Sequence, residues 1–388
     1  MRILFLTYYF EPDLCAGSFR NSSLFKELIN NLRQGDVIDV VTTKPNRYDS
    51  FEVEAKSKEE ISDAITVCRV DLPKHGSGML GQVKAFRIFY KEALRITEKS
   101  NYDLVYASSS RLFTAFLGAK VSKSKNANLY LDIRDIFKET ILDVYGNNLM
   151  KFALNVLLTK VENYTFKKAQ HINLVSKGFE SYFKKYKEPK FSFFTNGIDD
   201  IFLNFSAQNT LPNKQKTILY AGNIGESQGL DTIIPQVAVQ LADSHKFVII
   251  GDGGAKHKLV DALKTNNIKN VILKNPIKRN LLIEEYNKAD FLFLHLNHQK
   301  AFERVLPSKL FEYGAFNKPI IAGVNGYAST FLKENMDNII LFNPGDAKSL
   351  GNQLKQYEYK LSDRSDFVKK YSRSNINKEM VKSILKAV

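Results

Sequence analysis

The stretch RILFLTYYFEPDLCAGSFR at residues 2–20 decides the fold, because it joins a β-rich apolar run to a loop and then to a helix. Residues 2–9 have the composition of a buried strand, and the loop that follows contains proline and glycine. Leucines then recur every four residues within 20–32, which predicts a helix. The chain is therefore expected to begin with a strand, a loop and a helix in that order.

The same alternation continues in two series, separated by a polar stretch at 206–216 that we interpret as a linker. Buried strands that alternate with helices indicate a parallel sheet, so the sequence predicts an α/β protein with two successive sheets. Such sheets bind ligands beyond the carboxyl ends of their strands. The further apolar runs are 37–43, 103–109 and 128–135 in the first series, and 217–222, 246–253, 270–276, 290–296 and 318–324 in the second.

Length and composition exclude several classes of protein. A chain of 388 residues is long for one core and fits two domains, which implies a cleft between them. Cys15 and Cys68 cannot build a disulfide framework and have no metal-binding spacing, which favours a reducing cytoplasmic setting. The apolar run at the start is too short for a signal peptide, and no segment approaches the ~20 apolar residues of a membrane-spanning helix.

The net charge of +15 predicts an anionic partner. The segment 151–190 is the densest basic stretch, with nine lysines against three glutamates. No zinc-finger spacing, RNP-like motif or basic leucine zipper accompanies this charge, so nucleic acid is not expected as a partner. We expect an anionic membrane surface, contacted by 151–190 and by the basic and aromatic residues of 82–96. The alternatives are a solvated basic face without a partner and an ordinary amphipathic helix packed on the sheet.

Several motifs follow one another along the chain. They are YYFEPDLCAGSFR (8–20), LDIRDIFKE (131–139), FFTNGIDD (193–200), YAGNIGESQGLD (220–231), IGDGG (250–254) and LPSKLFEYGAFNKPIIAG (306–323). In this order and spacing they resemble glycosyltransferase family 4, most of all the branch that builds bacterial surface polysaccharides. The resemblance implies the retaining GT-B architecture, with two Rossmann-like domains and a cleft between them. Residues 1–199 would form the acceptor-side domain, onto which 375–388 cross back, and 200–374 the nucleotide-sugar-binding domain.

The resemblance implies three site residues in the first domain. Gly17 matches a glycine near the donor diphosphate, and Asp135 matches an aspartate at the reacting centre. Arg134 stands where the family often has a histidine, so we expect the Asp135 carboxylate to act there, while the guanidinium orients a phosphate or an acceptor carboxylate. The alternatives are a loop glycine that needs positive φ and an ion pair between Arg134 and Asp135 that closes the strand end.

In the second domain the resemblance implies residues that bind the donor phosphates. Asn223 and Gln228 stand where relatives usually place an arginine and a lysine, and neutral amides cannot neutralise a diphosphate. We therefore expect the positive charge to come from Lys309 and Arg304, with Ser308 as a hydroxyl donor.

Three more positions are expected to face the nucleoside. Glu312 matches the glutamate that accepts hydrogen bonds from the ribose hydroxyls, although the first glutamate of the family's usual pair is out of register. Gly251 allows a tight turn after a strand, and Ile277 matches a position whose backbone meets the base. The alternative for Glu312 is a solvated helix residue.

Patterns of other protein classes are weak. Gly76, Gly78 and Gly81 form a GxGxxG that does not directly follow a strand, which favours a loop over a dinucleotide site. His295 and His298 have no clear third ligand, and the chain contains no Asp-x-Asp motif. We therefore expect catalysis without a metal or other cofactor. The chain also has no GxSxG elbow, which disfavours a nucleophilic hydrolase.

The resemblance implies that the protein is a retaining glycosyltransferase. Its donor would be a nucleotide-diphosphate sugar, expected to be UDP-N-acetylhexosamine or a 6-deoxy relative, and its acceptor a saccharide or lipid-linked saccharide in O-antigen or capsule synthesis. A lipid-linked acceptor implies a cytoplasmic protein attached peripherally to the inner face of the cell membrane. The alternatives are a nucleotide-sugar epimerase of the same fold and a non-catalytic glycan- or membrane-binding protein. Because the site residues are divided between the halves, the domains are expected to close, with Gly197 in the hinge.

Overall fold

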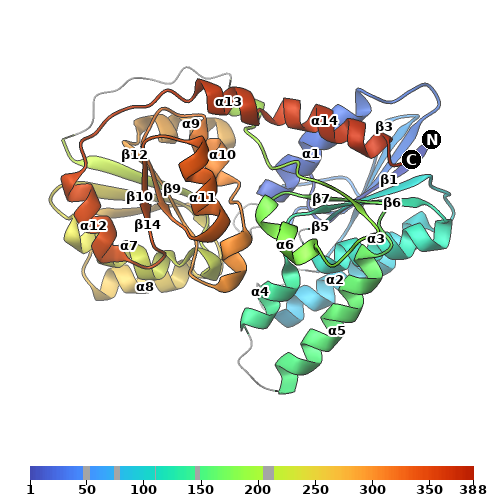
Figure 1. Ribbon diagram of the computed structural model, residues 1–388, viewed down its shortest axis with the longest axis horizontal. Coiled ribbons are helices and arrows are strands. Elements are labelled where there is room, and N and C mark those ends of the chain that lie inside the picture. The colour runs from blue at the N-terminus through green and yellow to red at the C-terminus, as the bar shows by residue number, and fades with distance from the viewer. Residues whose placement is uncertain (47–52, 74–78, 110, 145–148, 204–213) are drawn as a thin grey trace. The chain divides into compact units, whose positions relative to one another are not determined.

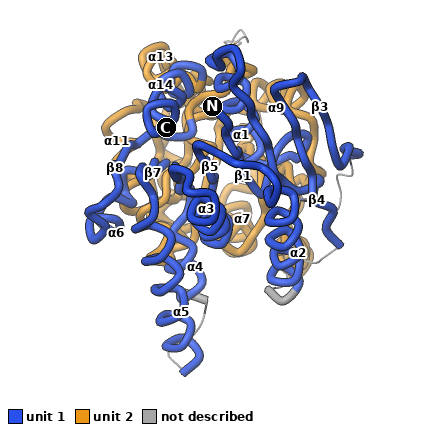
Figure 2. The backbone as a smooth tube through the Cα atoms, turned by 90° about the vertical axis from the view of Figure 1, so that its right-hand side faces the viewer, with its two compact units in different colours: residues 1–196, 374–388 blue, residues 197–373 orange. Residues whose placement is uncertain are grey.

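The computed structural model describes residues 1–46, 53–73, 79–109, 111–144, 149–203 and 214–388 (Figure 1). The chain divides into two compact units, coloured separately in Figure 2. Unit 1 comprises Met1–Asn196 and Ser374–Val388, and unit 2 comprises Gly197–Arg373. The sequence analysis places the corresponding boundaries after residues 199 and 374. Most of the predicted linker, and Gly76 and Gly78 of the GxGxxG, lie outside the described residues.

Unit 1 is built on an eight-stranded sheet with the order β3-β4-β2-β1-β5-β6-β7-β8. Neighbouring strands pair in parallel except β3 and β4, which are antiparallel. Central strands such as β5 and β6 are almost completely buried because helices cover both faces, which explains why most of their residues are apolar. The strands are β1 (Arg2–Thr7), β2 (Val37–Thr43), β3 (Lys58–Ser62), β4 (Ile65–Val70), β5 (Leu104–Ser109), β6 (Asn128–Ile133), β7 (His171–Leu174) and β8 (Lys190–Ser192).

The helices of unit 1 lie on both faces of this sheet (Figure 1). One face is covered by α1 and by the C-terminal helix α14, whose apolar side chains share a core with β1, β2, β5 and β6. On the other face α3 packs on β5, and α5 packs on α3. The helices are α1 (Ala16–Ile29), α2 (Met79–Thr97), α3 (Leu112–Lys125), α4 (Phe137–Val144), α5 (Leu149–Phe166), the 3-10 turn η1 (Lys177–Phe179), α6 (Glu180–Phe183) and α14 (Arg373–Leu385).

Unit 2 contains a six-stranded parallel sheet with the order β11-β10-β9-β12-β13-β14. Helices α7, α8 and α12 bury one face, and α9, α10, α11 and α13 bury the other. The strands are β9 (Lys216–Asn223), β10 (His245–Asp252), β11 (Val271–Lys274), β12 (Phe291–His295), β13 (Ile320–Gly323) and β14 (Ile339–Phe342). The helices are η2 (Asp200–Phe202), η3 (Glu226–Gln228), α7 (Leu230–Gln240), α8 (Lys256–Thr265), α9 (Arg279–Lys288), η4 (Lys300–Arg304), α10 (Lys309–Gly314), α11 (Gly326–Asn335), α12 (Ala347–Gln356) and α13 (Ser365–Tyr371).

The prediction of two successive α/β units is confirmed. Each apolar run named from the sequence coincides with a strand, with boundaries that differ by a few residues. The sequence analysis missed β3, β4, β7, β8 and β14. Strand β3 has the polar sequence KEEIS at a sheet edge, and β8 has only three residues, so neither presents a long apolar run.

Candidate functional site

The carboxyl ends of β1, β5 and β6 meet at one edge of the sheet in unit 1. The parallel register places Thr7 beside Ser108, and Ser109 beside Ile133. Residues that directly follow these strands therefore come together at this edge, which is where parallel sheets bind ligands. Arg134 and Asp135 are such residues, because β6 ends immediately before them.

Gly17 and Arg134 are in direct contact at this edge. Helix α1 begins at Ala16, and Cys15 caps it by accepting a hydrogen bond from the Ser18 amide at 3.4 Å. A β-carbon at position 17 would lie 2.5 Å from Nη1 of Arg134. The backbone of Gly17 is not in the left-handed region, so the alternative of a loop glycine that needs positive φ is wrong. The glycine instead leaves room for a guanidinium against the first turn of the helix.

The Arg134 side chain does not form the ion pair considered from the sequence. Among the described residues no carboxylate pairs with it, and its buried Nε has no hydrogen-bond partner. Burial lowers the pKa of Arg134, although Asp132 partly opposes this effect. An arginine held this way has hydrogen-bonding capacity for a ligand with a phosphate or carboxylate group.

The ion pair at this edge is formed by Arg20 and Asp132, which the sequence analysis missed. Arg20 Nε and Nη2 donate to the two Asp132 oxygens at 2.9 and 3.0 Å, and Asn173 donates to the same carboxylate at 2.7 Å. Arg20 also donates to the Thr195 carbonyl at 2.7 Å. Burial alone would raise the pKa of Asp132, but the Arg20 guanidinium and these hydrogen bonds hold it below its ordinary value. The pair fixes α1, β6 and the chain near residue 195 to one another.

Asp135 has the opposite electrostatic environment. Burial raises its pKa to about 6, while the Ile136 amide and the Arg134 charge oppose the rise. Asp132 and Asp135 therefore differ in pKa, although they are only three residues apart. Asp132 is ion-paired and its pKa is lowered, whereas the pKa of Asp135 is raised to about 6. A carboxyl group with a pKa near neutrality is suited to proton transfer or to stabilising positive charge in a transition state.

In unit 2, Lys309 lies over Gly222. Lys309 is the first residue of α10, and its ammonium group occupies the space that a side chain at Gly222, near the end of β9, would fill. The ammonium is 5.3 Å from the ring centroid of Tyr220. Burial lowers the pKa of Lys309, and the negative charge of Glu312 partly opposes this effect. The structure thus holds the Lys309 ammonium group at the carboxyl end of β9.

Glu312 lies one turn after Lys309 on the same helix. Its Oε2 accepts a hydrogen bond from the Tyr286 hydroxyl at 3.1 Å, and Tyr286 itself is fully buried in the core of unit 2. The carboxylate is half-buried, so the alternative of a solvated helix glutamate is wrong. The hydrogen bond orients the carboxylate next to Lys309, and together they present a cation and an acceptor from one helix face.

Asn223 and Gln228 form a contact with each other. Asn223 Nδ2 donates to Gln228 Oε1 at 2.8 Å, and the Gly225 amide donates to the same oxygen at 3.2 Å. The Gln228 carbonyl in turn accepts from Nδ1 of His295 at 2.6 Å. These bonds give the turn after β9 a defined shape, and they orient the amides along the loop.

Both ring nitrogens of His295 form hydrogen bonds with the protein backbone. Its Nδ1 contacts the Gln228 carbonyl, and its Nε2 accepts from the Gly345 amide at 3.0 Å, so both ring nitrogens are engaged in the neutral form. Burial lowers the pKa of His295, although the hydrogen bond to the Gln228 carbonyl partly opposes this effect. Among the residues described, no three His, Cys, Asp or Glu side chains gather as a metal site would require.

The remaining predicted donor residues lie around the same end of the sheet or nearby. Gly251 pairs with Gly222 across β10 and β9, and its φ of +156° and the close Gly222 carbonyl leave no space for a side chain. Arg304 ends η4, and Ser308 immediately precedes α10. The half-buried side chain of Ile277 packs against the core of unit 2.

The two chain crossings between the units are tied together within unit 2. Gly197 has a φ of +69°, and its carbonyl accepts from Nη2 of Arg373 at 3.2 Å. Arg373 also forms an ion pair with Asp199 at 2.8 Å, and its amide donates to the Ile198 carbonyl at 2.7 Å. Hydrogen bonds and an ion pair therefore join the first residues of unit 2 to its last residue.

The aromatic residues of α2, predicted to contact a membrane, pack within unit 1. Phe89 is fully buried, Phe86 stacks on Tyr8, and Tyr90 stacks on Phe116. The expectation that these aromatic side chains face a membrane is therefore wrong, because they pack against the interior of unit 1. The basic residues of α2 remain exposed. In the described parts of the chain, no helix has the length and apolar character needed to cross a bilayer.

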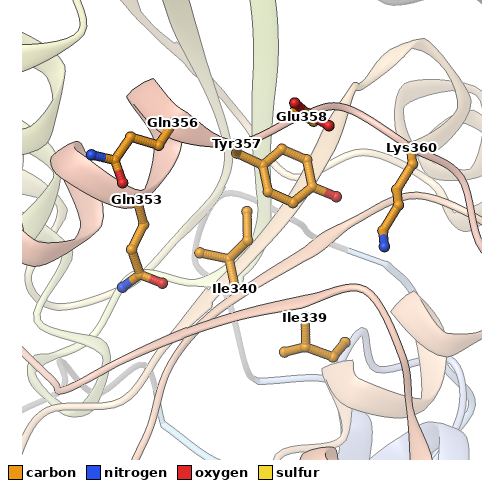
Figure 3. A pocket seen from close by; sticks show the side chains of 7 residues that line it. All are labelled: Ile339, Ile340, Gln353, Gln356, Tyr357, Glu358 and Lys360. Atoms are coloured by element: carbon orange, nitrogen blue, oxygen red, sulfur yellow. The ribbon is translucent and has the colours of Figure 1, made fainter.

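A hollow of about 500 Å³ lies elsewhere on unit 2 (Figure 3). Ile339 and Ile340 at the amino end of β14 line it, together with Tyr357 and Lys360 from the segment after α12. It contains none of the predicted site residues and lies at the amino end of its strand. Because ligands of parallel sheets bind at the carboxyl ends, we assign the site to the Lys309 edge instead.

Comparison with known proteins finds a family that matches most of unit 2. Residues 202–374 match the family Glycosyl transferases group 1. A putative colanic acid biosynthesis glycosyl transferase of Escherichia coli (strain K12) is 36% identical over 104 residues, which is 26% of this chain and 25% of that protein. The aligned region thus spans about a quarter of that relative.

Solved structures match the whole chain in fold. Sucrose-phosphate synthase from Thermosynechococcus elongatus has a TM-score of 0.67 at 14% identity and covers 99% of this chain and 94% of its own. Anabaena HepE in complex with UDP-glucose has a TM-score of 0.67 at 14% identity and covers 100% of both chains. At this identity the likeness concerns the fold. Residues 202–374 therefore carry a glycosyl transferases group 1 domain, within a chain that adopts the two-domain GT-B fold of solved glycosyltransferases.

Proposed function

We propose that this protein is a retaining glycosyltransferase. It moves a sugar from a nucleotide-diphosphate donor, UDP-N-acetylhexosamine or a 6-deoxy relative, to a saccharide or lipid-linked acceptor in O-antigen or capsule synthesis. The observation that carries this proposal is the placement of the Lys309 ammonium over Gly222, one helical turn from Glu312, inside the matched domain. The similarity to a colanic acid transferase supports polysaccharide synthesis as the context.

Unit 2 takes the donor in this proposal. Lys309 contacts the diphosphate and Glu312 accepts from the ribose hydroxyls, since a cation and a carboxylate side by side complement those two groups. Arg304 and Ser308 supply further donors to the phosphates. The turn that contains Asn223 and Gln228 supplies amide hydrogens, Gly251 keeps the strand end narrow, and the Ile277 backbone meets the base.

Unit 1 takes the acceptor and contributes the reacting carboxyl group. In this proposal Asp135 lies beside the anomeric carbon of the donor sugar, because its pKa of about 6 lets the carboxyl group exchange a proton or carry a negative charge near neutral pH. Arg134, packed on Gly17, orients a phosphate or acceptor carboxylate. The bond between the sugar carbon and the diphosphate breaks, the acceptor oxygen bonds to the same carbon, and the proton of the acceptor hydroxyl passes to the Asp135 carboxylate. In this proposal no metal takes part, and protein cations stabilise the leaving diphosphate.

A panel of nucleotide sugars in a thermal-shift assay tests the donor, because a ligand that binds only the native state raises the unfolding midpoint. The donor found in this way is then incubated with and without acceptor saccharides, and the anomeric configuration of the product is determined. Transfer with retained configuration supports the proposal. Epimerised sugar from donor alone would identify an epimerase, and tight binding without donor consumption would identify a non-catalytic binding protein.

A further inference from the structure

Helix α5 carries a row of large apolar side chains in solvent. Leu149 is 83% exposed, Phe152 67% and Leu157 54%. Met150 and Val156 are also exposed. Val156 lies four residues after Phe152, and Met150 lies two helical turns before Leu157, so the five side chains fall on one side of the helix. We call these five residues the apolar face of α5. Exposed apolar side chains gathered in one patch mark a binding surface more often than isolated ones do.

The apolar face belongs to the end of α5 that leaves the body of unit 1. The carboxyl half of the helix is anchored, with Leu158, Thr165 and Phe166 buried. The amino half extends away from the sheet, as both views show (Figures 1 and 2). The apolar face is therefore presented at the end of a helix whose opposite end is fixed in the core.

The exposed charge carried by α5 and by the residue that directly follows it is positive. Lys160 and Lys167 are exposed and continue the line of Leu149 and Val156 toward the base of the helix. The one acidic residue in α5, Glu162, is buried and accepts from the Tyr182 hydroxyl at 2.7 Å. An apolar tip followed by lysines, on a helix whose own carboxylate is buried, complements an anionic lipid surface, where acyl chains lie beneath negative headgroups.

We propose that the apolar face of α5 inserts into an anionic phospholipid surface, with Lys160 and Lys167 at the headgroups. The stretch from Leu149 to Leu157 rises about 12 Å along the helix axis. A helix inclined to the surface would bring this length within the ~5–10 Å depth reached by interfacial helices. The proposal rests on the proposed function for its purpose, since a lipid-linked acceptor lies in such a surface. A second copy of the chain is the less favoured occupant, because two such faces would bring lysines together.

The chain contains no tryptophan, which permits a direct test of insertion. In F152W the introduced indole is the sole tryptophan fluorophore of the full chain. With vesicles of phosphatidylethanolamine and phosphatidylglycerol, we expect its emission to shift to shorter wavelength and to be quenched by brominated acyl chains. V239W is the matched control, since Val239 is 58% exposed on α7 of unit 2, and its emission should not change. Unchanged F152W emission on vesicles that bind the protein would overturn the proposal.

Vesicle flotation tests the same surface by binding. The variant F152S/L157S should partition to the anionic vesicles at least about tenfold more weakly than the unsubstituted protein. V239S/L281S, which changes exposed apolar residues of unit 2, should float like the unsubstituted protein. Equal flotation of all three proteins, or loss of flotation in K160E/K167E but not in F152S/L157S, would contradict insertion.

Light scattering without lipid separates the occupants. A monomer that floats with vesicles supports the lipid surface, whereas a dimer that F152S/L157S converts to monomer would assign the apolar face to a second copy. None of these measurements uses donor or transfer. A failure of the proposed glycosyltransferase activity would therefore leave the flotation result unchanged, and a failure of flotation would leave transfer to a water-soluble acceptor unchanged.

Discussion

The ammonium group of Lys309 lies where the β-carbon of any side chain at Gly222 would stand. Gly222 is near the end of β9 and Lys309 begins α10, so these two segments are far apart in the sequence. The Lys309 side chain can take this position only because residue 222 has no side chain. The Gly222 backbone has a φ of +147°, which glycine adopts without strain. The glycine therefore determines where the positive charge of this edge is held.

Lys309→Ala should weaken the binding of nucleoside diphosphate by about 10–150-fold, since a hydrogen bond to a charged group contributes about 1.5–3 kcal/mol. The affinity for the nucleoside alone should stay nearly unchanged, because the lysine faces the phosphates in our proposal. Titration calorimetry with both ligands measures the difference. Equal weakening of the two ligands, or none, would remove Lys309 from the diphosphate site. Arg304→Ala tests the second cation in the same way.

Glu312→Ala should abolish measurable donor binding with the fold intact. The carboxylate is held by the Tyr286 hydroxyl at 3.1 Å, so Tyr286→Phe is a matched control that removes this bond and keeps the acceptor. We expect Tyr286→Phe to bind donor only a few-fold more weakly, because it loses a single hydrogen bond of about 1 kcal/mol. Nucleotide affinity of Glu312→Ala equal to that of the unsubstituted protein would show that the carboxylate does not meet the ribose.

Asp135→Asn should suppress transfer and yet stabilise the protein at neutral pH. Because the pKa of Asp135 is raised from 3.8 to about 6, the folded state holds the proton more tightly, and stability is lost as pH rises through this interval. The substitution removes that loss, so the free energy of unfolding at pH 7 should increase by on the order of 1–3 kcal/mol. Near pH 4 the gain should vanish. Chemical denaturation at both pH values checks the sign.

The neighbouring Asp132 should behave in the opposite way. Its pKa is lowered by Arg20, so its contribution to stability is present at neutral pH and is lost as pH falls. Asp132→Asn leaves the Arg20 guanidinium buried without its counter-charge and should lower the free energy of unfolding by about 3–5 kcal/mol.

The nucleotide affinity of Asp135→Asn should be nearly unchanged, because the proposed ribose and diphosphate contacts lie in unit 2. A large loss of that affinity in a folded variant would contradict the division of roles.

Gly17→Ala should lower transfer with little effect on stability. The new β-carbon would meet Nη1 of Arg134 at 2.5 Å, and the flexible end of that side chain can move away. Alanine is also favoured over glycine within a helix by about 1 kcal/mol. Gly118→Ala is the contrasting control, because its β-carbon would meet Ala107 Cβ at 2.7 Å in the packed core, and it should destabilise the fold. Thermal unfolding and transfer rates of the two variants distinguish the cases. Full activity in Gly17→Ala would show that the position of the Arg134 guanidinium is unimportant.

The sequence analysis located the strands with long apolar runs and missed strands that are short or contain polar residues, such as β3, β7 and β8. Strands such as β5 and β10 are buried on both faces, so each contains a run of apolar residues that can be recognised without knowing its neighbours. Strands such as β3 and β8 lie at a sheet edge, where solvent permits polar residues and short lengths. The aromatic residues of α2 were misassigned for a related reason, because a helical pattern shows that one face is apolar but not what covers it.

Some features of the candidate site could likewise be predicted from local sequence, and others could not. The motifs around Asp135 and Lys309 could be recognised from local sequence, as could the two-unit α/β architecture, because apolar period and turn residues are properties of neighbouring residues. The pairing of Arg20 with Asp132, 112 positions apart, the contact of Lys309 with Gly222, and the raised pKa of Asp135 were decided by the tertiary structure alone. They depend on strand order, register and burial, which bring together side chains that no local pattern relates.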